Sequence, residues 1–222
     1  MCRFLMIKSK KAKDMRMLLN DFASMCEKSR TTDGDRQGDG WGAAWWDGLY
    51  GWRTRKSLAP IWEERRVFGR LPPTRLLAVH ARSASFPHQK GEISFNQPYA
   101  RNGFCFVFNG SLEGVRMEQT IEGDIGAQKI WNLILERLRA GASLATALTE
   151  VRALLYNQAS SVKGLNIGIA SALEMAILCD YSTEQEYFTL HHCHVGGDFV
   201  VSSEPLAGAC FSTMKRGEII SF

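Results

Sequence analysis

Long apolar runs are missing from this sequence of 222 residues. No stretch approaches the roughly 18 apolar residues that a membrane-spanning helix requires. The first residues, MCRFLMIKSKKAK, hold only the short apolar stretch FLMI before basic residues, which is unlike a secretory signal. We therefore expect a soluble, cytoplasmic protein with no membrane partner.

Closely spaced cysteine pairs are also missing. Six cysteines are scattered along the chain without CxxC spacing: Cys2, Cys26, Cys105, Cys179, Cys193 and Cys210. In a cytosolic chain of this length, the pattern predicts free thiols rather than a disulfide framework. Several lie in apolar surroundings, such as GFCFVF and AILCDY, and are expected to pack as small hydrophobic side chains. Cys2 differs from them by its position.

A strong excess of one charge is absent, because the net charge is only +4. The densest basic stretch, KSKKAKDMR (residues 8–16), is typical of the solvated start of a surface helix. A nucleic-acid-binding surface would need a larger basic patch with aromatic side chains or a reading motif nearby. We therefore expect no nucleic-acid partner.

The composition, with 45% hydrophobic and 23% charged residues, is that of a globular protein long enough for one well-buried domain. Strands are predicted at 2–8, 41–46, 51–56, 75–81, 104–109, 165–171, 175–181, 186–192, 199–202 and 218–222. Helices are predicted at 12–28 and, in the middle of the chain, near 130–138 and 144–155. Strands, then helices, then strands indicate the α+β class, and alternating βαβ units are absent.

Cys2 directly follows the initiator methionine. Methionine is usually removed when the next side chain is small, and its removal would leave a thiol and a free α-amino group on one residue. A thiol has a pKa of about 8.5 and an α-amine one of about 7.7–8.0, so the amine can accept the thiol proton near neutral pH. Most cysteines at a second position have no such role, so the hypothesis needs support from other residues.

Polar residues with complementary chemistry follow apolar segments further along the chain. LLAVHARSAS runs into Arg82, FCFVFNGSLEG runs into Asn109 and Gly110, and EGDIGAQKIW places Asp124 just before a helix. An arginine binds a carboxylate through two hydrogen bonds, an aspartate binds an ammonium, and an asparagine amide beside a glycine N–H stabilises an oxyanion. These groups complement glutamine. Each also has a structural alternative: an ion pair for Arg82, a turn for Asn109–Gly110, and a helix N-cap for Asp124.

The order of these segments resembles that of a known family. MCRFLM, GDGWGAAWW, HARSAS, NQPYARNGFCFVFNGSL, EGD and VVSSEPL follow one another as in class II glutamine amidotransferase domains, most closely the stand-alone members. The resemblance covers nearly the whole chain. It implies an N-terminal-nucleophile hydrolase with a four-layer αββα sandwich, in which residues 1–222 form a single glutamine amidotransferase type-2 domain.

The resemblance also implies the site residues. They are Cys2 as the nucleophile, Asn109 and Gly110 as the oxyanion hole, Arg82 as the ligand of the glutamine carboxylate, Asp124 as the ligand of the α-amine, and Ser85 near the substrate. Around them, Gly40 and Gly42 are expected to permit close backbone packing, and Trp41 to lie in the core. Ser83 and Gln97 replace a tryptophan and a histidine that the family often carries. Ile125–Gly126 also departs from its pattern, and these changes concern the substrate more than the chemistry.

The implied reaction is hydrolysis of the glutamine side-chain amide through a Cys2 thioester, which releases ammonia and glutamate without a metal or organic cofactor. The chain has no room for a synthase domain, so either a synthase subunit accepts the ammonia or the protein is a hydrolase. A γ-glutamyl peptide or metabolite presents the same α-carboxylate and α-ammonium as glutamine. Hydrolysis of such a compound is therefore the alternative.

Two hypotheses from other classes remain open. The run TLHHCHVGG places three histidines and Cys193 together and suggests a metal site. In a strand, however, His192 and His194 lie on one face while His191 and Cys193 lie on the other, which is short of the tetrahedral set that zinc prefers. The second hypothesis is an interaction module that keeps the fold without the activity.

Overall fold

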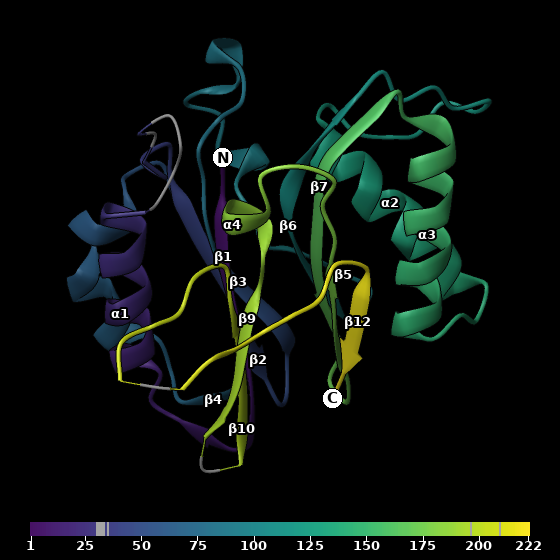
Figure 1. Ribbon diagram of the computed structural model, residues 1–222. Helices are drawn as coiled ribbons and strands as arrows, with labels where there is room; N and C mark the ends of the chain where they lie inside the picture. The colour runs from purple at the N-terminus through teal and green to yellow at the C-terminus, as the bar shows by residue number, and fades with distance from the viewer. Residues whose placement is uncertain (30–33, 35, 196, 209) are drawn as a thin grey trace.

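Two antiparallel sheets form the centre of the protein in the computed structural model, which describes residues 1–29, 34, 36–195, 197–208 and 210–222 (Figure 1). The larger sheet has the strand order β11-β9-β10-β1-β4-β2-β3. Its strands are β1 (Arg3–Lys13), β2 (Trp41–Asp47), β3 (Gly51–Ser57), β4 (Thr74–Ala81), β9 (His191–Val195), β10 (Asp198–Ser202) and β11 (Ser212–Thr213). The smaller sheet has the order β12-β8-β7-β6-β5. Its strands are β5 (Tyr99–Arg101), β6 (Phe104–Glu113), β7 (Ser161–Ala170), β8 (Met175–Cys179) and β12 (Glu218–Ser221).

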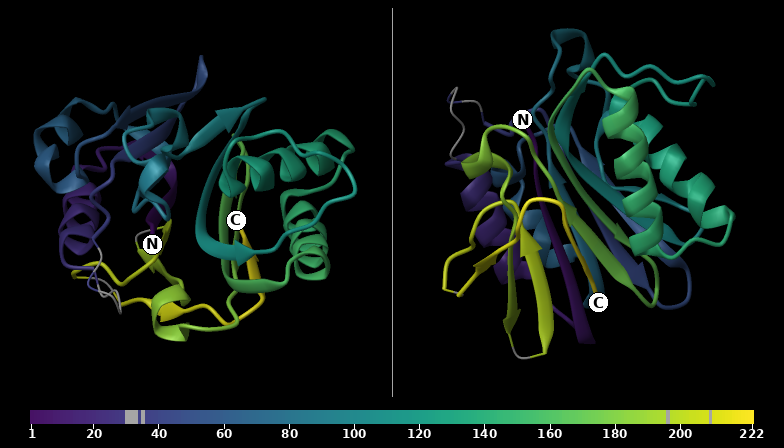
Figure 2. Two further views of the ribbon diagram at one scale, coloured as in Figure 1. Left: turned by 90° about the horizontal axis from the view of Figure 1, so that it is seen from above. Right: turned by 45° about the vertical axis from the view of Figure 1, so that its right-hand side comes forward.

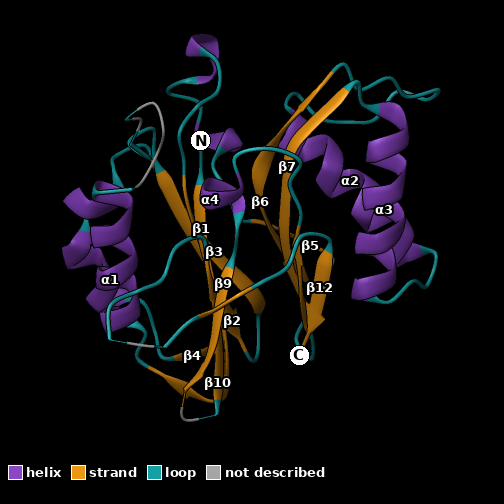
Figure 3. Cartoon of the chain, in the orientation of Figure 1, coloured by secondary structure: helices purple, strands orange, loops and turns teal. Residues whose placement is uncertain are grey.

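Helices cover the outer face of each sheet, as Figures 2 and 3 show. The larger sheet packs against α1 (Arg16–Glu27) and the short 3₁₀ helices η1 (Ile61–Glu63) and η2 (Arg65–Arg70). The smaller sheet packs against α2 (Gly126–Arg139) and α3 (Leu144–Gln158). Short helices η3 (Pro87–Gln89), η4 (Ile93–Phe95) and α4 (Gln185–Phe188) lie in connections.

Three buried hydrophobic clusters separate these layers. One lies between the larger sheet and α1, one between the two sheets, and one between the smaller sheet and α2 and α3. In β1, Leu5 and Ile7 contribute to the first cluster while Phe4 and Met6 contribute to the second, as the alternation of a strand requires. The predicted four-layer αββα sandwich of the α+β class is confirmed. No helix in the described part of the chain is long and apolar enough to span a membrane.

The prediction that residues 8–16 begin a surface helix was wrong. Strand β1 continues to Lys13, and α1 starts only at Arg16. Lys8 pairs with Leu76 of β4 and with Phe199 of β10, and Lys13 pairs with Thr74 of β4, so pairing with neighbouring strands at both ends of this basic segment keeps it extended. The lysine side chains reach solvent at the end of a central strand.

The prediction of one strand over 186–192 was also wrong, because α4 occupies Gln185–Phe188 and β9 begins at His191. Glu184 adopts a left-handed backbone conformation with φ +51°, which starts the turn. The backbone N–H groups of Phe188 and Thr189 donate to the Glu184 and Gln185 carbonyls at 3.0 Å and 2.9 Å, which is the bonding of a helical turn and not of a strand.

Close packing at the start of β2 is confirmed. A Cβ atom on Gly42 would collide with the carbonyl oxygen of Gln97, and one on Gly40 would lie 2.6 Å from the carbonyl oxygen of Ser57. Gly40 also has φ +113°, which favours glycine. Trp41 between them is fully buried and packs edge-on against Phe68, so it belongs to the core as expected.

We predict that Gly42→Ala lowers the free energy of unfolding by about 1–3 kcal/mol, because the added methyl group forces β2 away from the Gln97 segment. Urea unfolding measures the change. Gly48→Ala is the matched control, since its Cβ would meet open space, and we expect a change within about 0.5 kcal/mol. Equal stability of the two variants would contradict the close approach.

Candidate active site

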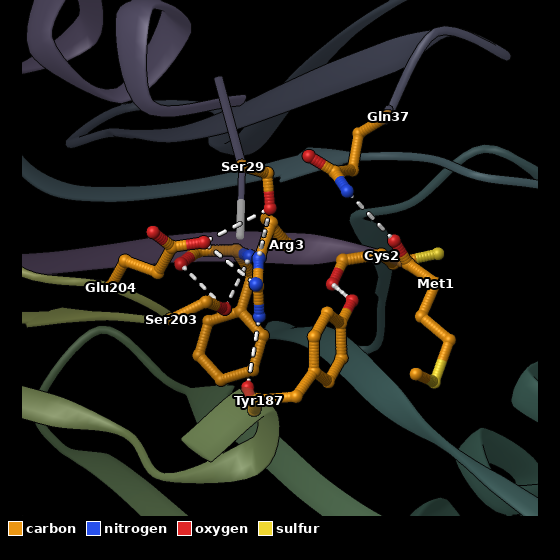
Figure 4. Close-up of polar contacts among 9 residues, drawn as sticks. Met1, Cys2, Arg3, Ser29, Gln37, Tyr187, Ser203 and Glu204 are labelled. Atoms are coloured by element: carbon orange, nitrogen blue, oxygen red, sulfur yellow. Dashed lines mark hydrogen bonds and ion pairs between the residues drawn. The ribbon is translucent and has the colours of Figure 1, made fainter. Parts of the chain in front are cut away.

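Cys2 lies directly before β1, the central strand of the larger sheet. Its thiol donates to the carbonyl oxygen of Ser83 at 3.5 Å, and its own carbonyl oxygen accepts from the Tyr187 hydroxyl at 2.8 Å. Figure 4 shows the Cys2 sulfur pointing away from Tyr187. The residue is therefore held between the segment that follows β4 and the short helix α4.

The next residue, Arg3, is buried and anchors the start of β1 through an ion pair with the half-buried Glu204. Its guanidinium contacts Glu204 at 2.6 Å, donates to the Ser29 hydroxyl at 2.9 Å and to the Tyr187 carbonyl at 2.9 Å, and stacks on the Tyr187 ring at 3.8 Å (Figure 4). Arg3 is only 1% exposed, so these contacts compensate the burial of its charge. Sequence reasoning missed this network, although Glu204 lies in the VVSSEPL segment.

One cavity of about 670 Å³ brings together four of the predicted site residues, namely Cys2, Arg82, Ser85 and Gly110. Asn109, the neighbour of Gly110, is not among the residues that line this cavity; it is 2% exposed, and its side-chain nitrogen has no hydrogen-bond partner among the described residues. A buried amide donor without a partner needs an explanation, since such groups are rare. Binding of an oxyanion would provide one.

Arg82 lies at the end of β4 and is only 4% exposed. Its guanidinium donates to the Gln89 carbonyl at 2.7 Å, to the Asn96 side-chain oxygen at 3.3 Å and to the Glu92 carbonyl at 3.4 Å. These acceptors are all neutral, and no carboxylate in the described part of the chain forms an ion pair with it. Among the described residues, Arg82 thus lacks the ion pair that its structural alternative required. Its positive charge is suited to a substrate carboxylate.

Ser85 follows a segment of irregular backbone that Asp39 holds in place. The Asp39 carboxylate accepts from the backbone N–H of Ala84 at 2.8 Å and forms an ion pair with Lys90 at 3.2 Å. The segment after β4 is thereby tied to the DGWG segment, residues 39–42, which leads into β2.

The backbone before Asn109 is held by two buried side chains from elsewhere in the chain. Gln97 donates to the Phe108 carbonyl at 3.3 Å and accepts from the Phe108 N–H at 2.6 Å, while the His80 Nε2 lies 3.2 Å from the same carbonyl. Burial lowers the pKa of His80 to about 3, so the ring is neutral near pH 7 and donates through Nε2. Gln97, which departs from the family pattern, therefore positions the strand that carries Asn109 and Gly110.

Asp124 does not line the cavity that holds Cys2. It faces a second cavity of about 470 Å³, together with Lys56, Tyr99 and Trp131. Asp124 is not the N-cap of α2 either, because Ile125 occupies the N-cap position. The Gln128 side chain instead accepts from the backbone N–H of Asp124 at 2.7 Å.

Gln37 is a further residue at the site that sequence reasoning missed. It is fully buried, and its side-chain nitrogen donates to the Met1 carbonyl at 3.1 Å (Figure 4). Its side-chain oxygen has no hydrogen-bond partner among the described residues. The only sequence signal was its position two residues before the DGWG segment.

The histidine-rich strand β9 has the predicted division between its two faces. His192 and His194 contact the Phe199 ring, with ring centroids 5.8 Å and 4.9 Å apart, while Cys193 packs in the cluster that includes α1 residues. Within the described residues, no three His, Cys, Asp or Glu side chains gather closely enough to hold a metal ion.

We predict that protonation of His80 contributes to acid unfolding. Because its folded-state pKa of about 3 lies below the ordinary value of 6.5, the unfolded chain takes up the proton first. The contribution of His80 to the free energy of unfolding is therefore fully present above about pH 6.5. Below that pH it falls by up to about 1.4 kcal/mol per pH unit. His80→Gln should show a shallower fall between pH 6 and 4 in urea unfolding. His88→Gln, at an exposed position, is the control, and identical slopes for both variants would contradict the assignment.

Comparisons with known proteins give structural relatives only. A scan of protein-family models finds no match, and neither does a search of the curated proteins. A solved structure described as a glutamine aminotransferase class-II domain protein from Silicibacter pomeroyi aligns with a TM-score of 0.64 at 16% identity, over 99% of this chain and 94% of that one. A predicted glutamine amidotransferase from Pseudomonas aeruginosa PA01 gives 0.60 at 16% identity, over 100% and 97%.

A larger enzyme aligns as well. The glutamine phosphoribosylpyrophosphate amidotransferase from B. subtilis gives a TM-score of 0.70 at 16% identity, over 99% of this chain, which spans 47% of that enzyme. At such identities the similarity establishes the fold and not the activity. The resemblance noted in the sequence is thus confirmed in three dimensions: the chain has the fold of class II glutamine amidotransferase domains.

Proposed function

We propose that the protein hydrolyses the side-chain amide of glutamine, or the γ-amide bond of a γ-glutamyl compound, through a thioester on Cys2. The observation that carries the proposal is the single cavity shared by Cys2, Arg82, Ser85 and Gly110. A nucleophile, a carboxylate ligand and an oxyanion-binding segment thereby reach one substrate-sized space.

The reaction would begin with removal of Met1, which frees the α-amine of Cys2. The amine takes the thiol proton, and the Cys2 sulfur bonds to the amide carbon. The Asn109 side-chain nitrogen and the Gly110 N–H stabilise the oxyanion, at about 2.7–4 kcal/mol per donor. The C–N bond then breaks, the leaving nitrogen receives the proton from the amine, and water hydrolyses the thioester to glutamate.

Gln37 has a clear role in this scheme. Once Met1 is absent, its side-chain nitrogen loses the Met1 carbonyl, and the new α-amine lies in the same surroundings. The Gln37 side-chain oxygen, a buried acceptor without a partner among the described residues, is suited to accept a hydrogen bond from that amine. Gln37 would thus orient the base of the reaction.

The glutamyl part of the substrate would bind by charge. Arg82, whose present acceptors are neutral, would bind the α-carboxylate with Ser85 nearby. Binding of the α-ammonium by Asp124 would require the segment around Asp124 to turn toward the first cavity, since Asp124 now faces the second. The same site suits glutamine and γ-glutamyl compounds.

Two of the structural relatives align over nearly their whole length, whereas the phosphoribosylpyrophosphate enzyme is about twice as long as the aligned part. We propose residues 1–222 as one catalytic domain. A synthase subunit that accepts the ammonia would be its partner.

We predict that Cys2→Ala lowers kcat for release of glutamate from glutamine by at least roughly a thousandfold, because Cys2 is the one cysteine among the described residues that line the cavity. Circular dichroism and urea unfolding should show an intact fold. Cys210→Ala, which removes an exposed thiol, is the matched control and should retain wild-type turnover. Hydrolysis of glutamine by Cys2→Ala at the wild-type rate would exclude the thioester mechanism.

A further inference from the structure

The cavity at Cys2 is larger than glutamine requires. Its volume of about 670 Å³ lies within the range of roughly 300–1,000 Å³ that buries a drug-sized ligand, and free glutamine is much smaller than such a ligand. Part of the cavity therefore lies beyond the groups that would bind the glutamyl core.

The additional space is mainly apolar. It extends from Gly110 on β6 toward α2, and six apolar side chains line it: Leu112, Val115, Met117, Ile121, Ile125 and Leu133, which we call the apolar arm. Most of them also pack against the cluster under α2 and α3. The neutral polar residues lining this part of the cavity are Ser111, Gln119 and Thr120, and the last two are exposed.

Charged groups are sparse in the same region. Besides Arg82, the charged residues that line the cavity are Glu113 and Lys129, and the Glu113 carboxylate forms an ion pair with Lys163 at 3.1 Å. The cavity thus combines a cationic, polar end at Arg82 with an apolar end. A ligand that matches both ends carries a carboxylate and an apolar group.

The segment 113–122, which carries three of the apolar side chains of the arm, is held by hydrogen bonds at both of its ends. The backbone N–H of Arg116 donates to the Gln158 carbonyl at 3.0 Å, and that of Ser160 donates to the Glu113 carbonyl at 3.0 Å. At the other end, the Asn132 side chain donates to the Glu122 carbonyl at 2.8 Å. These contacts tie the segment 113–122 to α2 and to the end of α3, so the space belongs to the fold.

Apolar side chains also remain in water at this cavity. Phe86 is 55% exposed and Val115 is 41% exposed, and both line it. Covering such surface with an apolar ligand group is favourable, because it removes apolar area from water.

We propose that the substrate is a glutamine or γ-glutamyl derivative that carries an apolar group, and that this group lies in the apolar arm. The inference rests on the proposed function, because Cys2 must attack the γ-carbonyl. If the apolar group is on the amide nitrogen, the C–N bond breaks and an apolar amine leaves with the proton from the α-ammonium of Cys2. If it is on the α-nitrogen, ammonia leaves instead, and in both cases water completes hydrolysis of the thioester.

Three substrates test the proposal: glutamine, γ-glutamyl anilide, and glutamine acylated on its α-nitrogen with a phenylacetyl group. We expect at least one of the two apolar compounds to show a kcat/KM roughly tenfold or more above that of glutamine. Which one does so assigns the apolar arm to the leaving amine or to the α-nitrogen.

A surface variant separates the arm from the rest of the site. Val115→Asp should lower the ratio of kcat/KM for the preferred apolar substrate to that for glutamine by at least fivefold, because it places a charge at the arm. Leu173→Asp is the matched control, since Leu173 is 77% exposed and does not line the cavity, and it should leave the ratio unchanged.

Different results would contradict the apolar arm and the proposed function. Turnover of glutamine at a kcat/KM equal to or above both apolar compounds, with no effect of Val115→Asp on the ratio, would overturn the apolar arm while leaving the thioester mechanism in place. Failure of the wild-type protein to hydrolyse any of the three compounds would overturn the proposed function itself, and the inference with it.

Discussion

A buried cation, Arg3, holds the start of the chain at the centre of the larger sheet. Its ion pair with Glu204 and its stacking on Tyr187 join β1 to the segment after β10 and to α4. Removing one member of a buried ion pair typically costs about 3–5 kcal/mol, since the other charge is left uncompensated. Because Arg3 is the neighbour of Cys2, this network fixes the position of the thiol relative to the cavity.

The two sheets meet at the site through the backbone of Phe108. His80 comes from β4 in the larger sheet, and Phe108 belongs to β6 in the smaller one. His80 and Gln97 together satisfy both backbone groups of Phe108, so the part of β6 that carries Asn109 and Gly110 is tied to β4, the neighbour of β1 in the larger sheet. The site thus depends on the face-to-face packing of two layers, and not on one loop.

Sequence periodicity predicted most of the sheets and the helices α2 and α3, because their apolar faces follow the periods of 2 and 3.6. It failed for the basic end of β1, where pairing with neighbouring strands outweighs side-chain character, and for α4, which is too short to show a period. Of the site, Cys2, Arg82, Ser85 and Gly110 were predicted from ordered motifs and share one cavity. Gln37, Tyr187 and Glu204 were missed as site residues, since their roles come only from contacts between distant segments.

The most direct measurement of the central claim is trapping of the wild-type protein with an electrophilic glutamine analogue, followed by mass spectrometry of the intact chain and of its peptides. The account predicts one adduct per chain, on the sulfur of Cys2, in molecules that have lost Met1. An adduct on another cysteine, or stoichiometric labelling of Cys2 in chains that still carry Met1, would contradict it.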